Sequence, residues 1–335
     1  DVDLPTWRPD STTEIDLIEE VARTRGYSSF PPRLPEVRQV GRLTDAQHLV
    51  RRLADVLVAK GAGEVQPMPF LAPGTLERYG LRSDAVVVSN PLDARESVLR
   101  TSLIPGIMAT LGANAAHRNR PAPLFELGSC YAQAPAGADL PVEWRELGVA
   151  IPEAEAPVAV QLAHVLTAAV GAPPPAVIDE TLPGLHPGRS ATLSIAGRKV
   201  GVVGEIAPGP GELDGVTARV AWLSLDLDAL LEGRGAPSQA VEVSRFPSSD
   251  LDLAFVVGDD IGSHEVAAAI ASAHPLVVDV HLFDVYRGES LGEGRRSLAY
   301  AVRLQAADRT LVDDETAKVR AMLIAAAEAL GATLR

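Results

Sequence analysis

The chain has 335 residues, of which 47% are apolar, and a formal charge of −14. Its length predicts two or three domains, and its acidity excludes a dedicated non-specific nucleic-acid binder, because such proteins are normally basic. No apolar run approaches the length that spans a bilayer, and the N-terminus lacks a signal-peptide pattern. The single cysteine, Cys130, excludes a disulfide framework and a multi-cysteine zinc site. It suits a cytoplasmic protein, and its apolar neighbours predict a buried structural thiol.

The N-terminal stretch predicts a short acidic helix over residues 14–25, with Gly26 as its stop signal. Two residue pairs near its start have the spacing of a capping box: Ser11 with Glu14, and Thr13 with Asp16. The chain opens with Asp1 instead of Met, in what reads as the middle of a domain, so we expect further sequence upstream.

The middle of the chain mixes helix-like and strand-like patterns up to about residue 235. The predicted elements are a helix over 44–60, a buried strand in 84–91 that runs into a turn at Asn90-Pro91, a helix over 102–117 with Pro105 in its first turn, a strand over 123–133, a helix over 160–171 and a hairpin over 191–206 with Gly197 in its turn. The segment 232–240 is rich in Gly and Pro, which predicts an interdomain linker.

The last part of the chain predicts six elements in the order β-α-β-β-α-β. They are strands at 251–257, 278–286, 297–305 and 331–335, and helices at 264–273 and 313–330. This order is that of a ferredoxin-like, split βαβ domain.

Familiar nucleotide-binding and hydrolase motifs are absent from the sequence, namely GxxxxGK[ST], GxGxxG, HExxH and GxSxG. The seven histidines are scattered. The most suggestive one, His186, precedes a Pro-Gly turn, where a packing or capping role is the favoured interpretation. The motifs therefore predict that the chain alone is not a self-sufficient enzyme.

Carboxylates crowd the start of the first helix. Asp16, Glu19 and Glu20 stand at i, i+3 and i+4 and so share one face, and Asp10 precedes them in a position to fold over the first turn. Hard oxygen ligands of this kind suit Mg²⁺ or Ca²⁺. Acidic residues at a helix start are also favoured by the helix dipole, and on physical grounds alone this second interpretation is preferred.

Four groups of motifs, in order along the chain, resemble the C-terminal part of the β subunit of bacterial phenylalanyl-tRNA synthetases. They are WRPDSTTEIDLIEEVARTRGY; NPLDARESVLRTSLIPGI with RPAPLFELGSCY; LHPGRSA with GVVGEIAP; and SRFPSSDLDLAFVV, LFDVYRG and GRRSLAYAVRLQAADRTLVDDE. The resemblance covers essentially the whole chain and implies an α+β fold. It implies the end of a DNA-binding-fold domain at 1–38, a non-catalytic class II synthetase-like antiparallel sheet module at 39–234, and a ferredoxin-fold anticodon-binding domain at 241–335.

The family forms an α2β2 enzyme that joins phenylalanine to tRNAPhe with ATP and Mg²⁺, and its active site lies in the α subunit. The sequence agrees, because no class II GxGxxGxxR motif is present to hold ATP. The resemblance implies that the segment 90–107 is a structural interface whose apolar helix faces pack against the α subunit. The family's editing and N-terminal tRNA-binding modules lie upstream, so we expect this chain alone not to hydrolyse mischarged tyrosyl-tRNA.

The resemblance also implies a Mg²⁺ site shared with the α subunit. The family's ligand positions are filled here by Asp10, Asp16, Glu19 and Glu20, although Pro9 and the Ser-Thr-Thr run after Asp10 depart from the family's usual residues. Glu14 is outside this set and is expected to cap the helix with Ser11.

The anticodon-binding domain implies contacts with the tRNAPhe anticodon stem and loop. From Ser244 to Arg335 the sequence has nine Lys or Arg against fourteen Asp or Glu, a net charge of −5, which predicts a small footprint with stacking and positioning contacts. The candidate contact residues are Arg245, Phe246, Ser248, Tyr286, Arg296 and Arg309. Two alternatives stay open: a free-standing RNA-binding or regulatory paralogue, and a structural interaction module whose anticodon domain no longer binds RNA. On the residues alone, the favoured interpretation is that the aromatic side chains are core and the arginines are solvated or paired.

Overall fold

The computed structural model describes residues 2–33, 41–209, 214–235 and 243–335, and contacts divide the chain into two compact units, Asp1–Thr44 and Asp45–Arg335. The first unit contains helix α1 (Glu14–Arg25) and the 3-10 turn η1 (Tyr27–Ser29). The predicted helix over 14–25 is confirmed. It ends at Gly26, whose φ of 90° is a conformation that glycine adopts readily.

A seven-stranded sheet forms the centre of the second unit, in the order β1-β4-β5-β9-β8-β7-β6. All neighbouring strands are antiparallel except β1 and β4. The strands are β1 (Gly63–Glu64), β4 (Leu124–Ala132), β5 (Val142–Pro152), β6 (Ala176–Asp179), β7 (Leu185–Ile195), β8 (Arg198–Ile206) and β9 (Val220–Asp226). The predicted strand at 123–133 is β4. The predicted hairpin is β7–β8, whose turn residues Ala196 and Gly197 both have positive φ.

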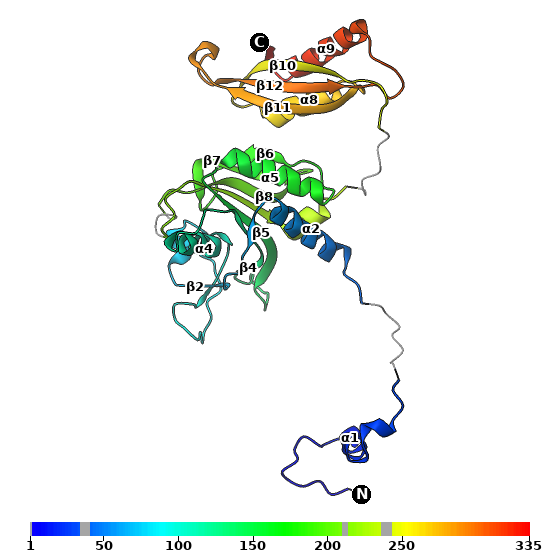
Figure 1. Cartoon of the computed structure of the whole chain (residues 1–335). Helices are drawn as coiled ribbons and strands as arrows, with labels where there is room; N and C mark the ends of the chain where they lie inside the picture. The colour runs from blue at the N-terminus through cyan, green and yellow to red at the C-terminus, as the bar shows by residue number, and fades with distance from the viewer. Residues whose placement is uncertain (1, 34–40, 210–213, 236–242) are drawn as a thin grey trace. The chain divides into compact units, whose positions relative to one another are not determined.

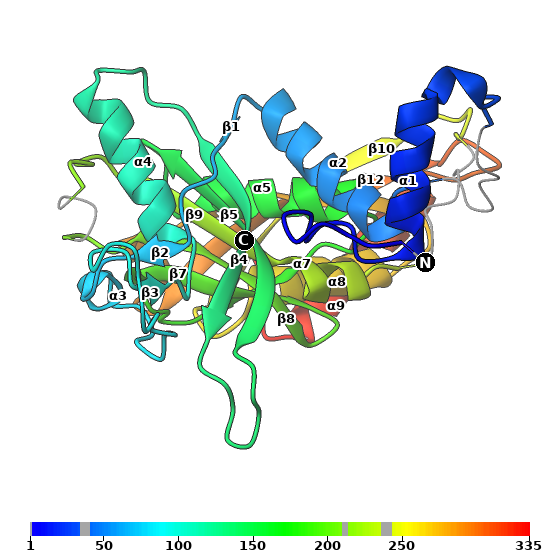
Figure 2. The same cartoon turned by 90° about the horizontal axis from the view of Figure 1, so that it is seen from below.

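Helices cover both faces of this sheet (Figures 1 and 2). Helices α2 (Asp45–Ala59) and α5 (Ala156–Ala169), with the short α7 (Leu227–Glu232), pack on one face, and α4 (Ile104–Ala116) packs on the other. Because successive side chains of a strand point to opposite faces, Phe125 lies in the first core and its neighbour Leu124 in the second. The predicted helices at 44–60, 102–117 and 160–171 are thus confirmed, with Pro105 in the first turn of α4.

One prediction for this region is wrong. Residues 84–91 do not form a buried strand, because within the described part of the chain only Val87 makes an isolated bridge, to Val98, and its side chain is 64% exposed. On α4, Ile107 and Met108 are buried in the module's own core, and the interface expected over 90–107 stays a prediction. Residues 84–91 pack, through Ala85, beside three short elements: β2 (Phe70–Leu71), α3 (Thr75–Arg78) and β3 (Val98–Leu99).

The C-terminal domain has the predicted β-α-β-β-α-β order. Its elements are β10 (Ser249–Gly258), α8 (Ser263–Ser272), β11 (Val277–Tyr286), the 3-10 turn η2 (Glu289–Leu291), β12 (Arg295–Leu304), α9 (Asp313–Glu328) and β13 (Thr333–Leu334). The antiparallel sheet has the order β11-β12-β10-β13. Both helices pack on one face, where Phe255, Tyr300 and Leu323 are fully buried, and among the described residues no helix packs on the other face.

The chain is therefore a mixed α+β protein. The expected linker at 232–240 lies partly outside the described residues, as does the expected boundary between 38 and 39. The proposed domain limits, 1–38, 39–234 and 241–335, stay predictions. No helix in the part of the chain that the structure describes is both long enough and apolar enough to cross a membrane.

Candidate functional site

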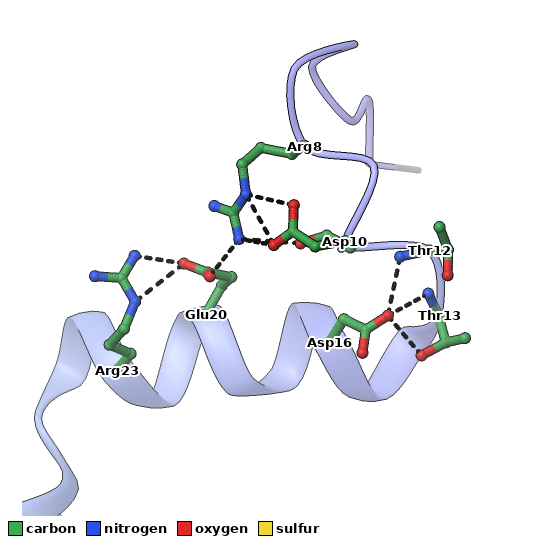
Figure 3. A network of polar contacts seen from close by, with 8 residues as sticks. Arg8, Asp10, Thr12, Thr13, Asp16, Glu20 and Arg23 are labelled. Carbon is green, nitrogen blue, oxygen red and sulfur yellow. Dashed lines mark hydrogen bonds and ion pairs between the residues drawn. The ribbon is translucent and has the colours of Figure 1, made fainter. Parts of the chain in front are cut away.

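Arg8 lies at the centre of the acidic cluster at the start of α1 (Figure 3). Its Nη2 donates to Asp10 Oδ2 at 2.8 Å and to Glu20 Oε1 at 2.7 Å, and its Nε donates to Asp10 Oδ1 at 3.0 Å. Arg23 binds the other oxygen of Glu20 at 2.5 Å. Hydrogen bonds from Arg8 hold the pKa values of Asp10 and Glu20 below their usual range. Two of the four predicted metal ligands thus already converge on one cation, the guanidinium of Arg8.

Asp16 has a different role, because it caps the helix. Its Oδ2 accepts hydrogen bonds from Thr12 N at 2.9 Å, Thr13 N at 2.7 Å and Thr13 Oγ1 at 2.8 Å. The bond from the Thr13 backbone is the main cause of its lowered pKa. The capping box is therefore Thr13 with Asp16, and the expected pairing of Glu14 with Ser11 is wrong. Ser11 is instead buried and accepts a hydrogen bond from Arg8 Nη2 at 3.2 Å.

The four acids suit a magnesium ion in their chemistry but only partly in their positions. Glu19 is exposed, Asp16 is engaged by the helix start, and Asp10 and Glu20 share Arg8. Among the described residues, no three His, Cys, Asp or Glu side chains are grouped closely enough to hold a metal ion. The ligand set Asp10, Asp16, Glu19 and Glu20 therefore stays a prediction, and this chain by itself does not arrange it around one point.

The cap of α1 gives a testable dependence on pH. Since folding depresses the pKa of Asp16, its stabilising contribution is present above its ordinary pKa of 3.8 and is lost as the pH falls through the lower folded value. We expect the protection factors of the Thr12 and Thr13 amides, which compare the observed exchange with that of an unstructured chain at the same pH, to fall in that acidic range in the wild-type chain, and at neutral pH in Asp16→Ala. NMR hydrogen exchange measures both effects. Glu14→Ala is the control, and equal exchange in the two variants would contradict the assignment.

A second cluster of polar side chains lies under α4 and is buried. Arg100 and Glu126 form a buried ion pair at 2.7 Å, and Arg100 Nε donates to Ser129 O at 2.8 Å. Nearby, the buried Glu146 faces the Cys130 thiol, and burial raises the pKa of both groups. Cys130 is therefore the buried structural thiol predicted from the sequence and not an activated nucleophile.

The predicted RNA contacts lie in different environments in the C-terminal domain. Arg245 and Ser248 are exposed just before β10, whereas Phe246 is half-buried. Arg296 lies opposite the buried Val257, and its Nη2 donates to Ile261 O at 2.9 Å. Arg309 forms ion pairs with Asp308 and Glu315, both at 2.9 Å. Arg296 and Arg309 therefore already have partners within the domain, while Arg245 and Ser248 present their side chains to solvent.

Tyr286 is the most distinctive of the candidates. It ends β11, and its side chain is 43% exposed. The guanidinium carbon of Arg335 lies 5.2 Å from the centroid of its ring, within the range of a cation–π contact. Arg335 was not among the residues predicted from the sequence, because its contact with Tyr286 is visible only once the strand order places β13 and β11 in one sheet.

Known families match the chain in three consecutive stretches. Residues 1–27 match the tRNA synthetase B5 domain, residues 30–227 the phenylalanyl tRNA synthetase beta chain CLM domain, and residues 244–335 the ferredoxin-fold anticodon binding domain. These matches define the class of the protein as a component of an aminoacyl-tRNA synthetase. The phenylalanine–tRNA ligase β subunits of Streptomyces avermitilis and Thermobifida fusca are 34% and 36% identical to it, over 100% and 99% of this chain. The chain belongs to the family of phenylalanine–tRNA ligase β subunits.

The chain spans 45% of the length of each of these two relatives. Among solved structures, a pyrrolysyl-tRNA synthetase from Desulfitobacterium hafniense is 17% identical, with a TM-score of 0.48 over 69% of this chain and 81% of that one.

Proposed function

We propose that this chain is the part of a cytoplasmic phenylalanine–tRNA ligase that supports the catalytic α subunit and binds the anticodon region of tRNAPhe. Catalysis of ATP-dependent phenylalanylation belongs to the α subunit in an α2β2 complex. The observation that carries the proposal is the order of the three matched domains, which ends in an anticodon-binding domain with one sheet face that no helix of the described residues covers. The polar cluster beside α4 is buried and not open to a substrate, which supports a module without its own active site.

A surface for the α subunit is expected on exposed loops of the central module, because the apolar face of α4 is used internally. Leu92 lies in the loop before β3, and Leu140 lies in the β4–β5 hairpin loop that projects from the sheet in Figure 2; both side chains are strongly exposed.

Two measurements on the purified 335-residue chain test the proposal. It should bind an RNA stem-loop that carries the tRNAPhe anticodon at a stated salt concentration, and it should catalyse no phenylalanine-dependent ATP–pyrophosphate exchange. Co-expression with a matching α subunit should give a stable complex. Robust exchange by the lone chain, or no RNA binding together with no complex, would contradict the proposal.

The finer part of the proposal concerns magnesium. Asp10, Asp16, Glu19 and Glu20 are proposed to hold Mg²⁺ together with a ligand from the α subunit. Their hard oxygen donors support this, as does the convergence of Asp10 and Glu20 on one cation. Because three of the four acids have partners within this chain, the lone chain should bind the ion only weakly.

We expect the triple variant Asp16→Ala, Glu19→Ala, Glu20→Ala to remove magnesium from the α2β2 complex and to weaken its assembly. Elemental analysis of the purified complex and its sedimentation measure the two effects. Glu14→Ala is the matched control, since Glu14 is exposed on the same helix but lies outside the set. If the triple variant keeps the metal content and assembly of the wild type, the cluster is only a solvated and capped helix.

A further inference from the structure

Small side chains line the part of the open face of the C-terminal sheet that lies between Tyr286 and Arg335. Strand pairing places Ala254 opposite Ala299, and Val256 opposite Ser297. These positions alternate with the buried Leu253, Phe255 and Val257, so they lie on the face that no described helix covers. Long side chains at the two edges of the sheet can therefore extend over its middle.

Tyr286 and Arg335 do so from opposite edges. Tyr286 is paired with Ser297, while the Arg335 backbone N–H donates to Ala254 O at 2.9 Å beyond the last pairs of β13. Their strands are three inter-strand spacings apart, or about 14 Å, a gap that the two side chains bridge together. The guanidinium then lies 5.2 Å from the ring centroid. Ser297, between the two edges, is only 3% exposed on this otherwise open face.

The Tyr286 ring also lies close to the backbone of Gly288. A Cβ atom on Gly288 would lie 2.7 Å from Tyr286 Cζ and would overlap the hydroxyl. The ring therefore packs against a residue without a side chain, with Arg335 over its face. Despite both contacts, Tyr286 keeps 43% of its surface exposed, which leaves room for a further stacking partner.

We propose that Arg335 is a positioning residue for RNA recognition, which holds the Tyr286 ring as a stacking platform for one unpaired base of the anticodon loop. This role rests on the proposed tRNA-binding function. Base stacking on an aromatic ring tolerates a small, acidic footprint, because it needs no field of positive charge. A ring already held by Arg335 and Gly288 loses less conformational entropy when the base binds.

The test is a double-mutant cycle on the 335-residue chain, with fluorescence anisotropy of an RNA stem-loop carrying the tRNAPhe anticodon at one fixed salt concentration. Tyr286→Ala should weaken binding by about 5- to 150-fold, and Arg335→Ala by about 2- to 5-fold. The double variant should bind no more weakly than Tyr286→Ala. Arg335→Lys should recover most of the loss, because an ammonium also makes a cation–π contact.

Two further variants separate this role from simpler effects. Gly288→Val should displace the ring and weaken binding although Tyr286 itself is intact. Arg320→Ala, which removes the same charge from an exposed position on α9, should leave binding unchanged. The role of Arg335 would be overturned if the losses of RNA affinity in the two single variants add up in the double variant, or if Arg335→Ala binds RNA as tightly as the wild type. Either result would leave the proposed function standing. Absence of RNA binding by the unmodified chain would overturn both.

Discussion

Replacing Glu126 by Leu is expected to lower the free energy of unfolding of the central module by about 3–5 kcal/mol, because it leaves the buried Arg100 without a countercharge. Both side chains of this pair are at most 6% exposed. An arginine cannot neutralise itself by losing a proton. Urea unfolding followed by tryptophan fluorescence measures the loss, since Trp222 is fully buried in the neighbouring core.

The opposite single variant, Arg100→Met, should lower the free energy of unfolding less than Glu126→Leu does, and the size of this loss should depend on pH. Burial already raises the pKa of Glu126 against the pull of Arg100, so without Arg100 the carboxyl can take up a proton. A folded-state pKa above the unfolded value means that stability is retained at low pH and lost as the pH rises through the folded value. We therefore expect Arg100→Met to be more damaging at pH 8 than at pH 5.

The double variant Arg100→Met, Glu126→Leu is the decisive control. Replacing a whole buried pair by apolar residues of similar volume is often neutral or stabilising. It should therefore be more stable than Glu126→Leu alone. Arg145→Met, which removes the exposed pair with Asp228, should change stability little. If the double variant instead loses as much stability as the two single variants together, the charges of Arg100 and Glu126 do not neutralise each other.

The hydrophobic periodicity of the sequence, together with its Gly and Pro stop signals, was sufficient to predict most of the secondary structure. The first helix has the predicted bounds, because the stop signal at Gly26 and the acidic start are both local features. The β-α-β-β-α-β order follows from local patterns as well. The strand predicted at 84–91 failed for a non-local reason. Its valines have apolar character, but the one bridge that the segment makes joins Val87 to Val98 of the short β3, and the segment adds no strand to the large sheet.

The candidate sites were harder to predict, because their important contacts join residues that are distant in sequence or of opposite charge. Counting carboxylates around α1 overlooked Arg8, twelve residues before Glu20, which the loop brings between two of the acids. Both capping boxes had correct spacing, and only the backbone conformation at Thr13 selects one of them. The contact of Tyr286 with Arg335 depends on strand order, which no local pattern encodes.

Replacing Trp222 by Ala is expected to destabilise the central module by about 3–5 kcal/mol, the usual cost of truncating a large buried aromatic residue. Trp222 is 1% exposed on β9, in the core between the sheet and α4. Urea unfolding followed by circular dichroism measures the change. Trp7→Ala is the matched control, because this tryptophan is 77% exposed in the other compact unit and should leave the transition unchanged.

The neighbouring Gly148 makes the prediction specific to packing. A Cβ atom there would lie 2.9 Å from Trp222 Cη2 and 3.1 Å from Leu103, so Gly148→Ala alone should cost about 1–3 kcal/mol through overpacking. In a chain that already carries Trp222→Phe, the smaller ring vacates that space, and the same Gly148→Ala change should cost distinctly less. The two substitutions are then coupled, as contacting residues are. Equal costs in both backgrounds would mean that the ring does not limit the space at Gly148, and that Leu103 alone sets the need for glycine on β5.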